Sequence, residues 1–218
     1  MPWMSIDDEK RIAAEAAAEL VADGMLVGLG TGSTVAHLLP ALAARELEIR
    51  CVATSDATTE HARGCGLRVE AFESLERLDI AIDGADQIAP DGWLVKGGGG
   101  AHTREKIVAA AADRFVVIAD SSKPVGEIAA PIPLELHRFG LAATLRELGD
   151  TVLREDTPPT PDGGVIADYL GEIPGPAGLA ARLSQTPGVV DHGLFSPALV
   201  ADVIVAHGDR VDRTAHPL

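Results

Sequence analysis

The sequence predicts an α/β protein with a doubly wound parallel sheet and a small α+β insert in its second half. Within residues 1–123, short apolar runs that end in glycine or polar residues alternate with segments whose apolar residues recur at helical spacing. Short, almost continuously apolar strands are typical of parallel sheets that helices cover on both faces. After Pro131 the predicted order becomes strand, helix, strand, strand, helix, strand, which is the order of a ferredoxin-like unit. We therefore expect residues 1–129 and 199–218 to form the main domain and residues 130–198 the insert.

The main domain is expected to begin with an Ala-rich helix from Glu9 to Ala22, which ends at the Asp23-Gly24 pair because glycine readily stops a helix. Met25–Gly30 follows as an apolar run that stops in glycines, as a buried strand does. The other helices expected in this domain are Val35–Glu46, Thr58–Cys65 and Thr103–Asp113. The other expected strands are Ile49–Thr54, Leu67–Phe72, Leu78–Asp83, Arg114–Ala119 and Leu199–Ala206. Strands and helices thus alternate, which favours the α/β class.

The insert is expected to contain four strands and two helices. The strands are Ile132–Leu136, Thr151–Glu155, Val165–Leu170 and Val189–Phe195. The helices are Leu141–Leu148 and Gly178–Gln185. The Pro-rich stretch Thr157–Pro161 is expected to be a loop, because proline interrupts both kinds of element.

Composition limits the possible classes of protein. The 218 residues are 46% hydrophobic, which provides for a sizeable core and argues against disorder. Residues 1–20 carry several acidic side chains and no continuous apolar run, so they predict neither a signal peptide nor a membrane anchor. The protein is therefore expected to be cytoplasmic. Cys51 and Cys65 lack the spacing of metal ligands and are expected to be reduced and packed.

The net charge of −15 argues against a nucleic-acid partner, so any phosphate on a substrate must be met locally by backbone N–H groups and a few lysines. The segment Gly28–Thr34 (GLGTGST) suits this task, because glycines permit close approach and the N–H groups at a helix start attract an anion. Ser33 and Thr34 add hydroxyl donors. Val35 stands where a dinucleotide-binding fingerprint has its third glycine, and a tight connection without a ligand is the alternative interpretation.

Two carboxylates and a lysine form a second candidate group. Asp83 and Asp86 come at the end of a predicted strand, where open α/β sheets bind their ligands. These carboxylates could hold substrate hydroxyls or transfer protons, while Lys96 could neutralise a developing oxyanion. The glycines Gly97–Gly100 follow Lys96 and add entropy to the unfolded chain, so we expect something to approach their backbone closely. For Asp86, an Asp-capped turn is the alternative interpretation.

The third candidate is Glu105, in the first turn of the helix expected after those glycines. The helix dipole lowers the pKa of a carboxyl group there and burial raises it, and the sequence does not decide between these effects. A first-turn glutamate is in itself more often a favourable partner of the dipole than a catalytic group. His102 lies one turn earlier, but no third ligand is apparent, so no metal site is expected.

Six segments together resemble the ribose-5-phosphate isomerase A family, in the same order and with matching spacing. They are Gly30–Thr34, Thr54–Thr59 (TSDATT), Asp83–Asp86 (DGAD), Lys96–Gly99 (KGGG), Thr103–Lys106 (TREK) and Ala119–Lys123 (ADSSK). The resemblance is close from Lys10 to Lys123 and weaker beyond. It implies a Rossmann-like catalytic domain with an inserted lid domain, no metal or cofactor, and a homodimer or homotetramer. It also implies interconversion of D-ribose 5-phosphate and D-ribulose 5-phosphate in the non-oxidative pentose phosphate pathway.

The resemblance further implies roles for individual residues. Glu105 matches the family's catalytic base, and Lys96 and Asp83 match the groups that stabilise the oxyanion and assist ring opening. The other positions that match substrate-binding residues are Thr31, Gly32, Ser33, Thr34, Gly84, Ala85, Asp86, Gly97, Gly98, Gly99 and Lys123. Lys10 falls near a further phosphate-contacting lysine, with Arg11 as its rival. One carboxylate suffices for isomerisation through an enediolate, because it can take a proton from one carbon and return it to the next.

The sequence departs from the family pattern at three places. Gln87 stands where glutamate is usual, His102 replaces a small or apolar residue, and Thr157–Gly164 replaces an Asn- and Asp-rich turn. None of these includes the expected base, whereas the last one affects the shape expected for the lid domain.

Two other classes of function fit parts of the pattern. A nicotinamide-dependent dehydrogenase would use the glycine-rich turn, but the third glycine is missing and the KGGGG run would go unexplained. A non-catalytic sugar-phosphate sensor would keep the phosphate-binding segment, but no helix-turn-helix segment precedes the domain and the charge is strongly negative. The isomerase is the expected function, with the sensor as the alternative.

Overall fold

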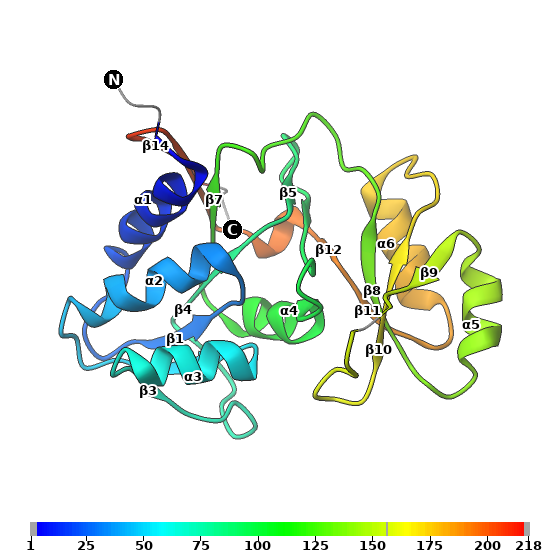
Figure 1. Cartoon of the computed structure of the whole chain (residues 1–218), viewed down its shortest axis with the longest axis horizontal. Coiled ribbons are helices and arrows are strands. Elements are labelled where there is room, and N and C mark those ends of the chain that lie inside the picture. Colours follow the sequence, from blue (N-terminus) through cyan, green and yellow to red (C-terminus); the bar gives the residue numbers. More distant parts are fainter. Residues whose placement is uncertain (1–3, 156, 216–218) are drawn as a thin grey trace. The chain divides into compact units, whose positions relative to one another are not determined.

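The computed structural model describes residues 4–155 and 157–215, and the chain divides into two compact units (Figure 1). Of the described residues, the first unit contains 4–85, 104–123 and 198–215. The second unit contains the rest, so that it begins at Asp86 and ends at Pro197.

The observed division differs from the expected domain boundaries at two segments and at Ala198, which was expected in the insert but belongs to the first unit. Residues 86–103 and 124–129 were expected in the main domain, but their contacts group them with the second unit. The reason is a three-stranded sheet, in which β5 (Gln87–Ile88) and β6 (Leu94–Val95) join β12 (Leu194–Phe195). Strands of two residues have no detectable periodicity, so sequence patterns do not reveal this sheet.

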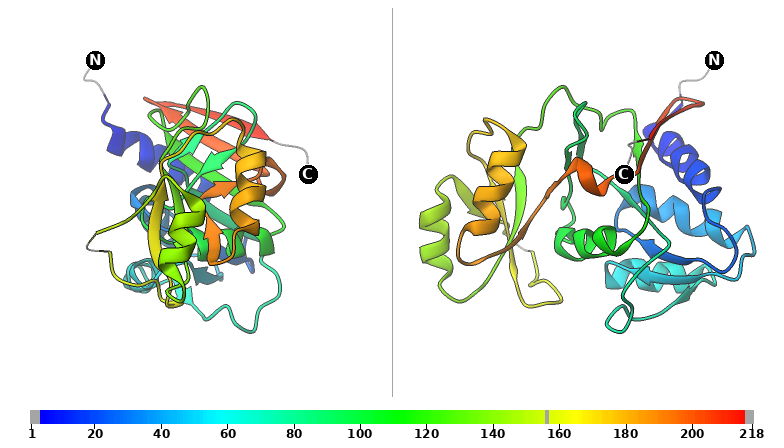
Figure 2. Two further views of the ribbon diagram at one scale, coloured as in Figure 1. Left: turned by 90° about the vertical axis from the view of Figure 1, so that its right-hand side faces the viewer. Right: turned by 180° about the vertical axis from the view of Figure 1, so that it is seen from behind.

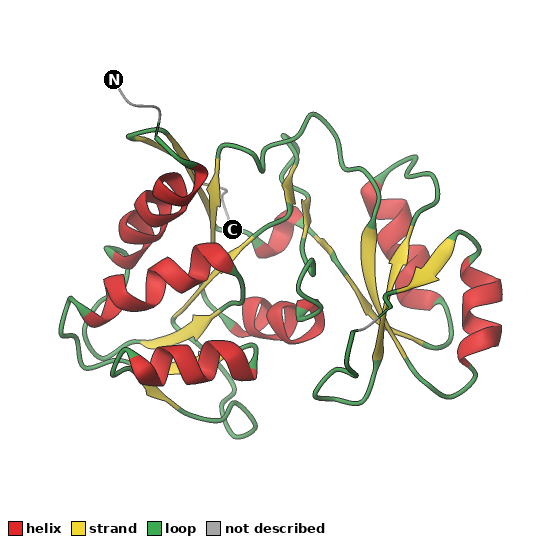
Figure 3. Ribbon diagram, viewed as in Figure 1, coloured by secondary structure: helices red, strands yellow, loops and turns green. Residues whose placement is uncertain are grey.

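The first unit is built around a seven-stranded sheet with the order β14-β13-β7-β4-β1-β2-β3. Strands are yellow and helices red in Figure 3. In this order the strands are Arg210–Ala215, Asp202–His207, Phe115–Asp120, Ile80–Gly84, Leu26–Leu29, Arg50–Ala53 and Arg68–Val69. Neighbouring strands are parallel, except that β14 runs antiparallel to β13. The predicted parallel sheet is confirmed. The edge strand β14, red in Figure 2, was missed because nearly all of its side chains are exposed.

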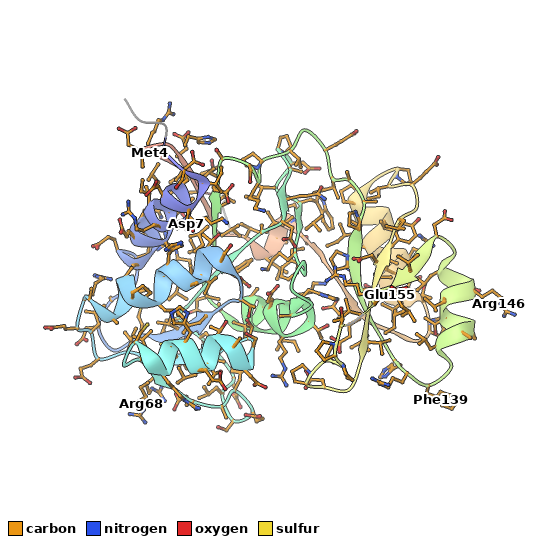
Figure 4. All side chains as sticks on the ribbon, in the orientation of Figure 1. Met4, Asp7, Arg68, Phe139, Arg146 and Glu155 are labelled. Carbon is orange, nitrogen blue, oxygen red and sulfur yellow. The ribbon has the colours of Figure 1, made fainter. Side chains whose placement is uncertain are left out.

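Among the described residues, the α-helices that lie wholly or mostly in this unit are α1 (Ile6–Ala18), α2 (Ser33–Ala43), α3 (Asp56–Gly64) and α4 (His102–Ala111), and the first two residues of α4 group with the second unit. Helix α1 begins three residues earlier than expected, because Ser5 and Asp8 form a capping box. The Ser5 hydroxyl accepts a hydrogen bond from the Asp8 N–H (3.1 Å), and Asp8 Oδ2 accepts one from the Ser5 N–H (3.1 Å). Helices α1 and α2 pack together and are also joined by Asp7, labelled in Figure 4, whose Oδ1 lies 3.0 Å from His37 Nε2.

The central strands bury both of their faces. Val27 and Leu29 are fully buried in a cluster with alanines of α1 and leucines of α2. Gly28 points to the opposite face, where an added Cβ would lie 2.5 Å from Val108 Cγ1 of α4. Helices therefore cover both faces, as a doubly wound sheet requires, and the glycine lets α4 approach the strand closely.

The second unit contains a four-stranded antiparallel sheet with the order β11-β8-β10-β9. In chain order its strands are β8 (Ile132–Leu136), β9 (Thr151–Leu153), β10 (Val165–Tyr169) and β11 (Val189–His192). Helices α5 (Leu141–Leu148) and α6 (Pro176–Gln185) complete the predicted strand and helix order. The ferredoxin-like arrangement is confirmed, and its core is a cluster of buried aliphatic side chains such as Leu134 and Leu183.

The last strand expected in the insert is interrupted at Gly193. The Gly193 N–H donates to the Pro133 carbonyl (2.7 Å), and the Gly193 carbonyl accepts from the Lys96 N–H (2.8 Å). A Cβ at residue 193 would overlap the Lys96 carbonyl oxygen. The chain therefore leaves the four-stranded sheet here and continues as β12 beside β6. In the described ranges, none of the helices combines the length and apolarity needed to cross a membrane.

Candidate active site

The carboxyl edge of the seven-stranded sheet brings together several of the predicted site residues. Strands β7, β4, β1 and β2 are neighbours, and each is followed at this edge by polar residues. Thr31–Thr34 follow β1, Asp83 is the last residue but one of β4, and Lys123 follows β7. The edge is where open α/β sheets bind ligands. Segments that are far apart in the sequence therefore meet here in the first unit.

Asp83 is fixed against the glycine-rich turn. Its side chain is only 3% exposed, and its Oδ1 accepts hydrogen bonds from the Thr31 N–H (3.2 Å) and the Gly84 N–H (2.7 Å). A Cβ at Gly30 would lie 2.5 Å from Asp83 Cβ. Glycine is therefore required at position 30 because the Asp83 side chain occupies the space that a larger residue would need.

Hydroxyl groups hold the same turn from the side of β2. Thr31 Oγ1 lies 2.8 Å from Thr54 Oγ1 and 2.9 Å from Ser55 Oγ. Thr58 Oγ1 donates to the Gly30 carbonyl (3.0 Å). The segment TSDATT thus supports the turn after β1, a contact that its sequence alone did not reveal.

The start of α2 is open to a ligand. Gly32 is the N-cap residue, with φ of +127°, and no side chain caps the helix. Ser33 is exposed and Thr34 is buried. A helix that begins without a capping side chain has N–H groups and a positive dipole end that suit an anion.

Glu105 is a buried carboxylate in the first turn of α4. Its side chain is 5% exposed, and it follows the glycine run by five residues. A merely dipole-favouring glutamate would be expected on the solvent side of the helix, so burial weakens that alternative.

Two lysines that the sequence singled out carry no ion pair with any residue in 4–155 or 157–215. Lys10 and Lys123 are both partly buried. Arg11 instead lies 2.8 Å from Glu15 and 3.8 Å from Asp8 along the exposed surface of α1. Arg11 is thus occupied by local partners, whereas the two lysines can receive a further anion.

In the second unit, Lys96 follows β6 and is 3% exposed. Its Nζ lies over the ring of Phe195, 5.5 Å from the ring centroid. An ammonium group at this degree of burial differs from the usual exposed lysine, and the aromatic face stabilises its charge.

The glycines after Lys96 are held by side chains of the same unit. Asp86 Oδ2 accepts a hydrogen bond from the Gly98 N–H (2.7 Å). Gly97 has φ of +99°, and a Cβ there would lie 2.6 Å from Nδ1 of the fully buried His102. His102, one of the three departures from the family pattern, therefore packs directly against the glycine run. Asp86 itself is exposed.

Arg154 is a supporting residue that sequence reasoning missed. Its guanidinium donates to the carbonyls of Gly97 (3.0 Å) and Gly98 (2.8 Å), and it is paired with Asp168 at 2.7 Å. No motif surrounds Arg154, since its role depends on β9 and β10 being neighbours. The arginine thus fixes the backbone that the sequence predicted would be approached closely.

The other two places where the sequence departs from the family pattern, Gln87 and the loop 157–164, also form hydrogen bonds. The Gln87 side-chain amide donates to the Ala129 carbonyl (2.7 Å) and accepts from the Ala129 N–H (2.8 Å). Thr160, in the loop 157–164, donates to the buried carboxylate of Glu135 (2.5 Å), which also accepts from Thr103. These polar contacts lie within the second unit.

The described residues include no group of three or more His, Cys, Asp or Glu side chains arranged to hold a metal ion. Cys51 and Cys65 are free thiols. Burial, with a smaller contribution from the charge of Glu70, raises the pKa of Cys51 to about 12, so this thiol stays protonated.

Comparison with known proteins points to one family. Residues 50–210 match the family model described as ribose 5-phosphate isomerase A (phosphoriboisomerase A). The chain is 48% identical over 206 residues to ribose-5-phosphate isomerase A of Caulobacter sp. (strain K31), covering 88% of this chain and 91% of that protein. The structure of ribose 5 phosphate isomerase A from Neisseria gonorrhoeae matches with a TM-score of 0.93 and 32% identity, covering 98% of both chains. A D-ribose-5-phosphate isomerase in complex with phospho-erythronic acid matches with a TM-score of 0.91 and 30% identity, covering 98% of this chain and 100% of that one.

Proposed function

Because the chain belongs to the ribose 5-phosphate isomerase A family, we propose that Glu105 is the base of its reaction and that Lys96 and Asp83 assist it. The protein is an aldose–ketose isomerase that interconverts D-ribose 5-phosphate and D-ribulose 5-phosphate, a reaction of the non-oxidative pentose phosphate pathway. The alternative of a non-catalytic sensor is not favoured by these matches. The observation that carries the assignment of the base is a glutamate, 5% exposed, at the start of the helix after the glycine run.

Glu105 would move one proton between neighbouring carbons of the open-chain sugar. In the direction from aldose to ketose it removes the proton from C2, and the electron pair of that bond forms the enediolate. The C2 hydroxyl proton passes to the C1 oxygen, and Glu105 returns its own proton to C1. The result is a carbonyl at C2 and a hydroxymethyl group at C1. No metal or cofactor is required by this sequence of steps, because a carboxylate and a cation suffice.

Lys96 would stabilise the oxygen that becomes negative in the enediolate. A preorganised cation acts most strongly where water is excluded, and the 3% exposure of Lys96 supports this role over that of a surface charge. Asp83 would exchange a proton with the ring oxygen and hydroxyls when the sugar ring opens. Its hydrogen bonds from Thr31 and Gly84 keep its carboxylate in one orientation, as such a transfer needs.

The phosphate group would be bound by the start of α2 and by Lys123 and Lys10. The uncapped N-terminus of α2 and the absence of ion pairs at both lysines within 4–155 and 157–215 support this assignment. Lys10 is preferred to Arg11 because Arg11 already pairs with Glu15. The other residues proposed to contact substrate are Thr31, Gly32, Ser33, Thr34, Gly84, Ala85, Asp86, Gly97, Gly98 and Gly99. Binding of phospho-erythronic acid by a relative supports a site for a phosphorylated sugar acid or sugar.

Location and assembly are extensions of the same proposal. We expect a cytoplasmic homodimer or homotetramer without a nucleic-acid or membrane partner. The net charge of −15 supports the absence of a nucleic-acid partner.

A coupled assay tests the function directly. Purified protein is incubated with ribose 5-phosphate in excess chelator, and formation of ribulose 5-phosphate is followed with an auxiliary enzyme that needs no added metal. We expect turnover to persist. Complete loss of activity that a divalent ion restores would contradict the metal-free mechanism.

A further inference from the structure

Glu9 is a buried carboxylate to which the reaction as described gives no role. Its side chain is 7% exposed, and both of its oxygens accept hydrogen bonds from backbone N–H groups. Oε2 accepts from Ser121 (2.9 Å), in the turn after β7, and Oε1 accepts from Gly208 (2.8 Å), in the turn after β13. Glu9 thus joins α1 to two loops at the carboxyl edge of the sheet.

The charge of Glu9 is retained in this position. Burial alone raises the pKa of Glu9, but the hydrogen bonds from Ser121 and Gly208 and the charge of His207 outweigh that effect and lower the pKa below its ordinary value. A buried anion close to a proposed phosphate site opposes phosphate binding electrostatically. Glu9 must therefore contribute something other than its charge if it serves that site.

The turn that Glu9 holds has no N–H group left for a ligand. The Ser121 N–H is bound by Glu9, the Ser122 N–H by Asp120 Oδ1 (2.9 Å), and the Lys123 N–H by the Asp120 carbonyl (3.2 Å). An anion at this turn must therefore be met by the Lys123 side chain and not by the backbone. The hydrogen bonds of the turn decide where that side chain begins.

The two lysines proposed to bind phosphate stand at the two ends of the Glu9–Ser121 hydrogen bond. Lys10 follows Glu9 directly in α1, and Lys123 lies two residues after Ser121. Consecutive Cα atoms are about 3.8 Å apart, so the Cα atom of each lysine lies within about 8 Å of the Cα atom of Glu9 or Ser121. Neither forms an ion pair with the described residues. Fixing Glu9 to Ser121 therefore fixes the distance between the backbone positions from which the two lysine side chains extend.

The composition of the chain makes these lysines informative. Of its 18 basic side chains only four are lysines, at positions 10, 96, 106 and 123. Arginine serves at all other cationic positions. An ammonium group is a compact, strongly hydrated point charge that binds phosphate from many directions, unlike the planar guanidinium. Two of these four lysines flank the Glu9 contact.

We propose that Glu9 is a positioning residue that sets Lys10 and Lys123 at the spacing needed to bind the phosphate group of the substrate. This inference rests on the proposed function, since it assigns a task to residues of that site. Glu9 acts through the two lysines and touches neither the phosphate nor the reacting carbons.

The test is Glu9→Gln, which keeps the size of the side chain but places an amide NH₂ against one of the two N–H donors. We expect the KM for ribose 5-phosphate and the inhibition constant of inorganic phosphate each to rise about tenfold, with kcat changed less than about threefold, as for lost ground-state binding. Removal of a negative charge alone would lower both constants. Unchanged constants with a lower melting temperature would show that Glu9 is only structural. Either of these two results overturns the proposal.

Asp202→Asn is the matched control. Asp202 is also buried in the first unit and accepts from Arg114 (2.7 Å) and Arg213 (2.8 Å), but it lies at the amino end of β13, away from the Gly208 turn. The Asp202→Asn substitution should lower the melting temperature without changing the KM for ribose 5-phosphate or the inhibition constant of phosphate. Parallel changes in both variants would mean that loss of stability, and not positioning, explains the result for Glu9.

Phosphate inhibition of two lysine variants serves as a test if Glu9→Gln does not fold. Stabilisation of the protein by phosphate serves as a test if ribose 5-phosphate is not the substrate. Lys10→Met and Lys123→Met should each weaken the inhibition by phosphate, and an unchanged inhibition constant in both would refute the proposal. The rise in melting temperature that inorganic phosphate causes in the wild type needs no turnover. This rise should be smaller in Glu9→Gln, or in Glu9→Asp, whose shorter side chain cannot reach both donors. An equal rise in the folded variant would refute the proposal whether or not ribose 5-phosphate is the substrate.

Discussion

Replacing Gly30 by alanine tests whether the position of the Asp83 carboxylate matters for turnover. The added Cβ would lie 2.5 Å from Asp83 Cβ and closer still to its carboxyl group. Carbon atoms in contact normally stay about 3.5–4.0 Å apart, so the turn or the carboxylate must move by about 1 Å or more. Misplacing a reacting group by about 1 Å can lower the rate about a hundredfold. We therefore expect kcat/KM to fall by about a hundredfold.

The expected loss of stability is smaller and can be separated from the loss of activity. Overpacking costs about 1–3 kcal/mol, which lowers the melting temperature of a chain of this length by about 2–12 °C. Gly171→Ala is the overpacking control, because its Cβ would lie 2.6 Å from Tyr169 Cζ in the core of the second unit. Gly64→Ala is the control without a steric clash, since no neighbouring side chain or backbone atom lies within 4 Å of its Cβ.

The variants are compared by the coupled assay and by thermal unfolding. Gly171→Ala should lose stability but keep kcat/KM near the wild-type value. Gly64→Ala should keep kcat/KM and lose no stability, because alanine favours a helix more than glycine does. A folded Gly30→Ala whose kcat/KM stays within about threefold of the wild type would contradict the expected loss. That result would show that the orientation of Asp83 does not limit the reaction.

Two further predictions concern charged residues. Lys96→Met should lower kcat by about a hundredfold or more and change KM less, because the negative charge that Lys96 stabilises appears only in the transition state. A rise in KM alone would mean that Lys96 binds the substrate and does not stabilise the transition state. Burial alone raises the pKa of Asp202, but hydrogen bonds from Arg114 and Arg213 outweigh this effect and hold the pKa below its ordinary value. Its contribution to stability is therefore present above about pH 4 and is lost as the pH falls through the lowered pKa. In urea, the wild type should have a larger free energy of unfolding than Asp202→Asn, by an amount that is constant from about pH 5 to 7 and shrinks in stronger acid. An amount that grows in acid would contradict this role of Asp202.

The fold was predictable where apolar periodicity is strong. The buried runs at Leu26–Leu29 and Phe115–Asp120 gave the parallel strands, and the element order after Pro131 gave the ferredoxin-like unit. The sequence did not reveal β5, β6 and β14, because two-residue strands have no period and an exposed edge strand has no apolar face. The start of α1 was predicted three residues too late, because the helix begins at the Ser5–Asp8 capping box and not at the Ala-rich segment.

The candidate site was predictable for residues at strand ends and helix starts. Gly30, Asp83 and Glu105 follow local signals that a single segment carries. Glu9 and Arg154 could not be found in this way, because each acts on backbone groups that are more than fifty residues away in the chain. Such contacts depend on which strands become neighbours, and no local pattern encodes that.

The proton transfer by Glu105 is tested most directly by Glu105→Gln in deuterated water. The substitution keeps the size of the side chain and removes its basicity, so kcat should fall by about a hundredfold to ten-thousandfold while the fold and substrate affinity persist. In the wild type, one carboxylate serving both carbons should exchange part of the transferred hydrogen with solvent deuterium. Glu105→Gln should show neither isomerisation nor exchange. Near-normal exchange in this variant would contradict the account and would mean that another group, with Asp83 as the first candidate, removes the proton.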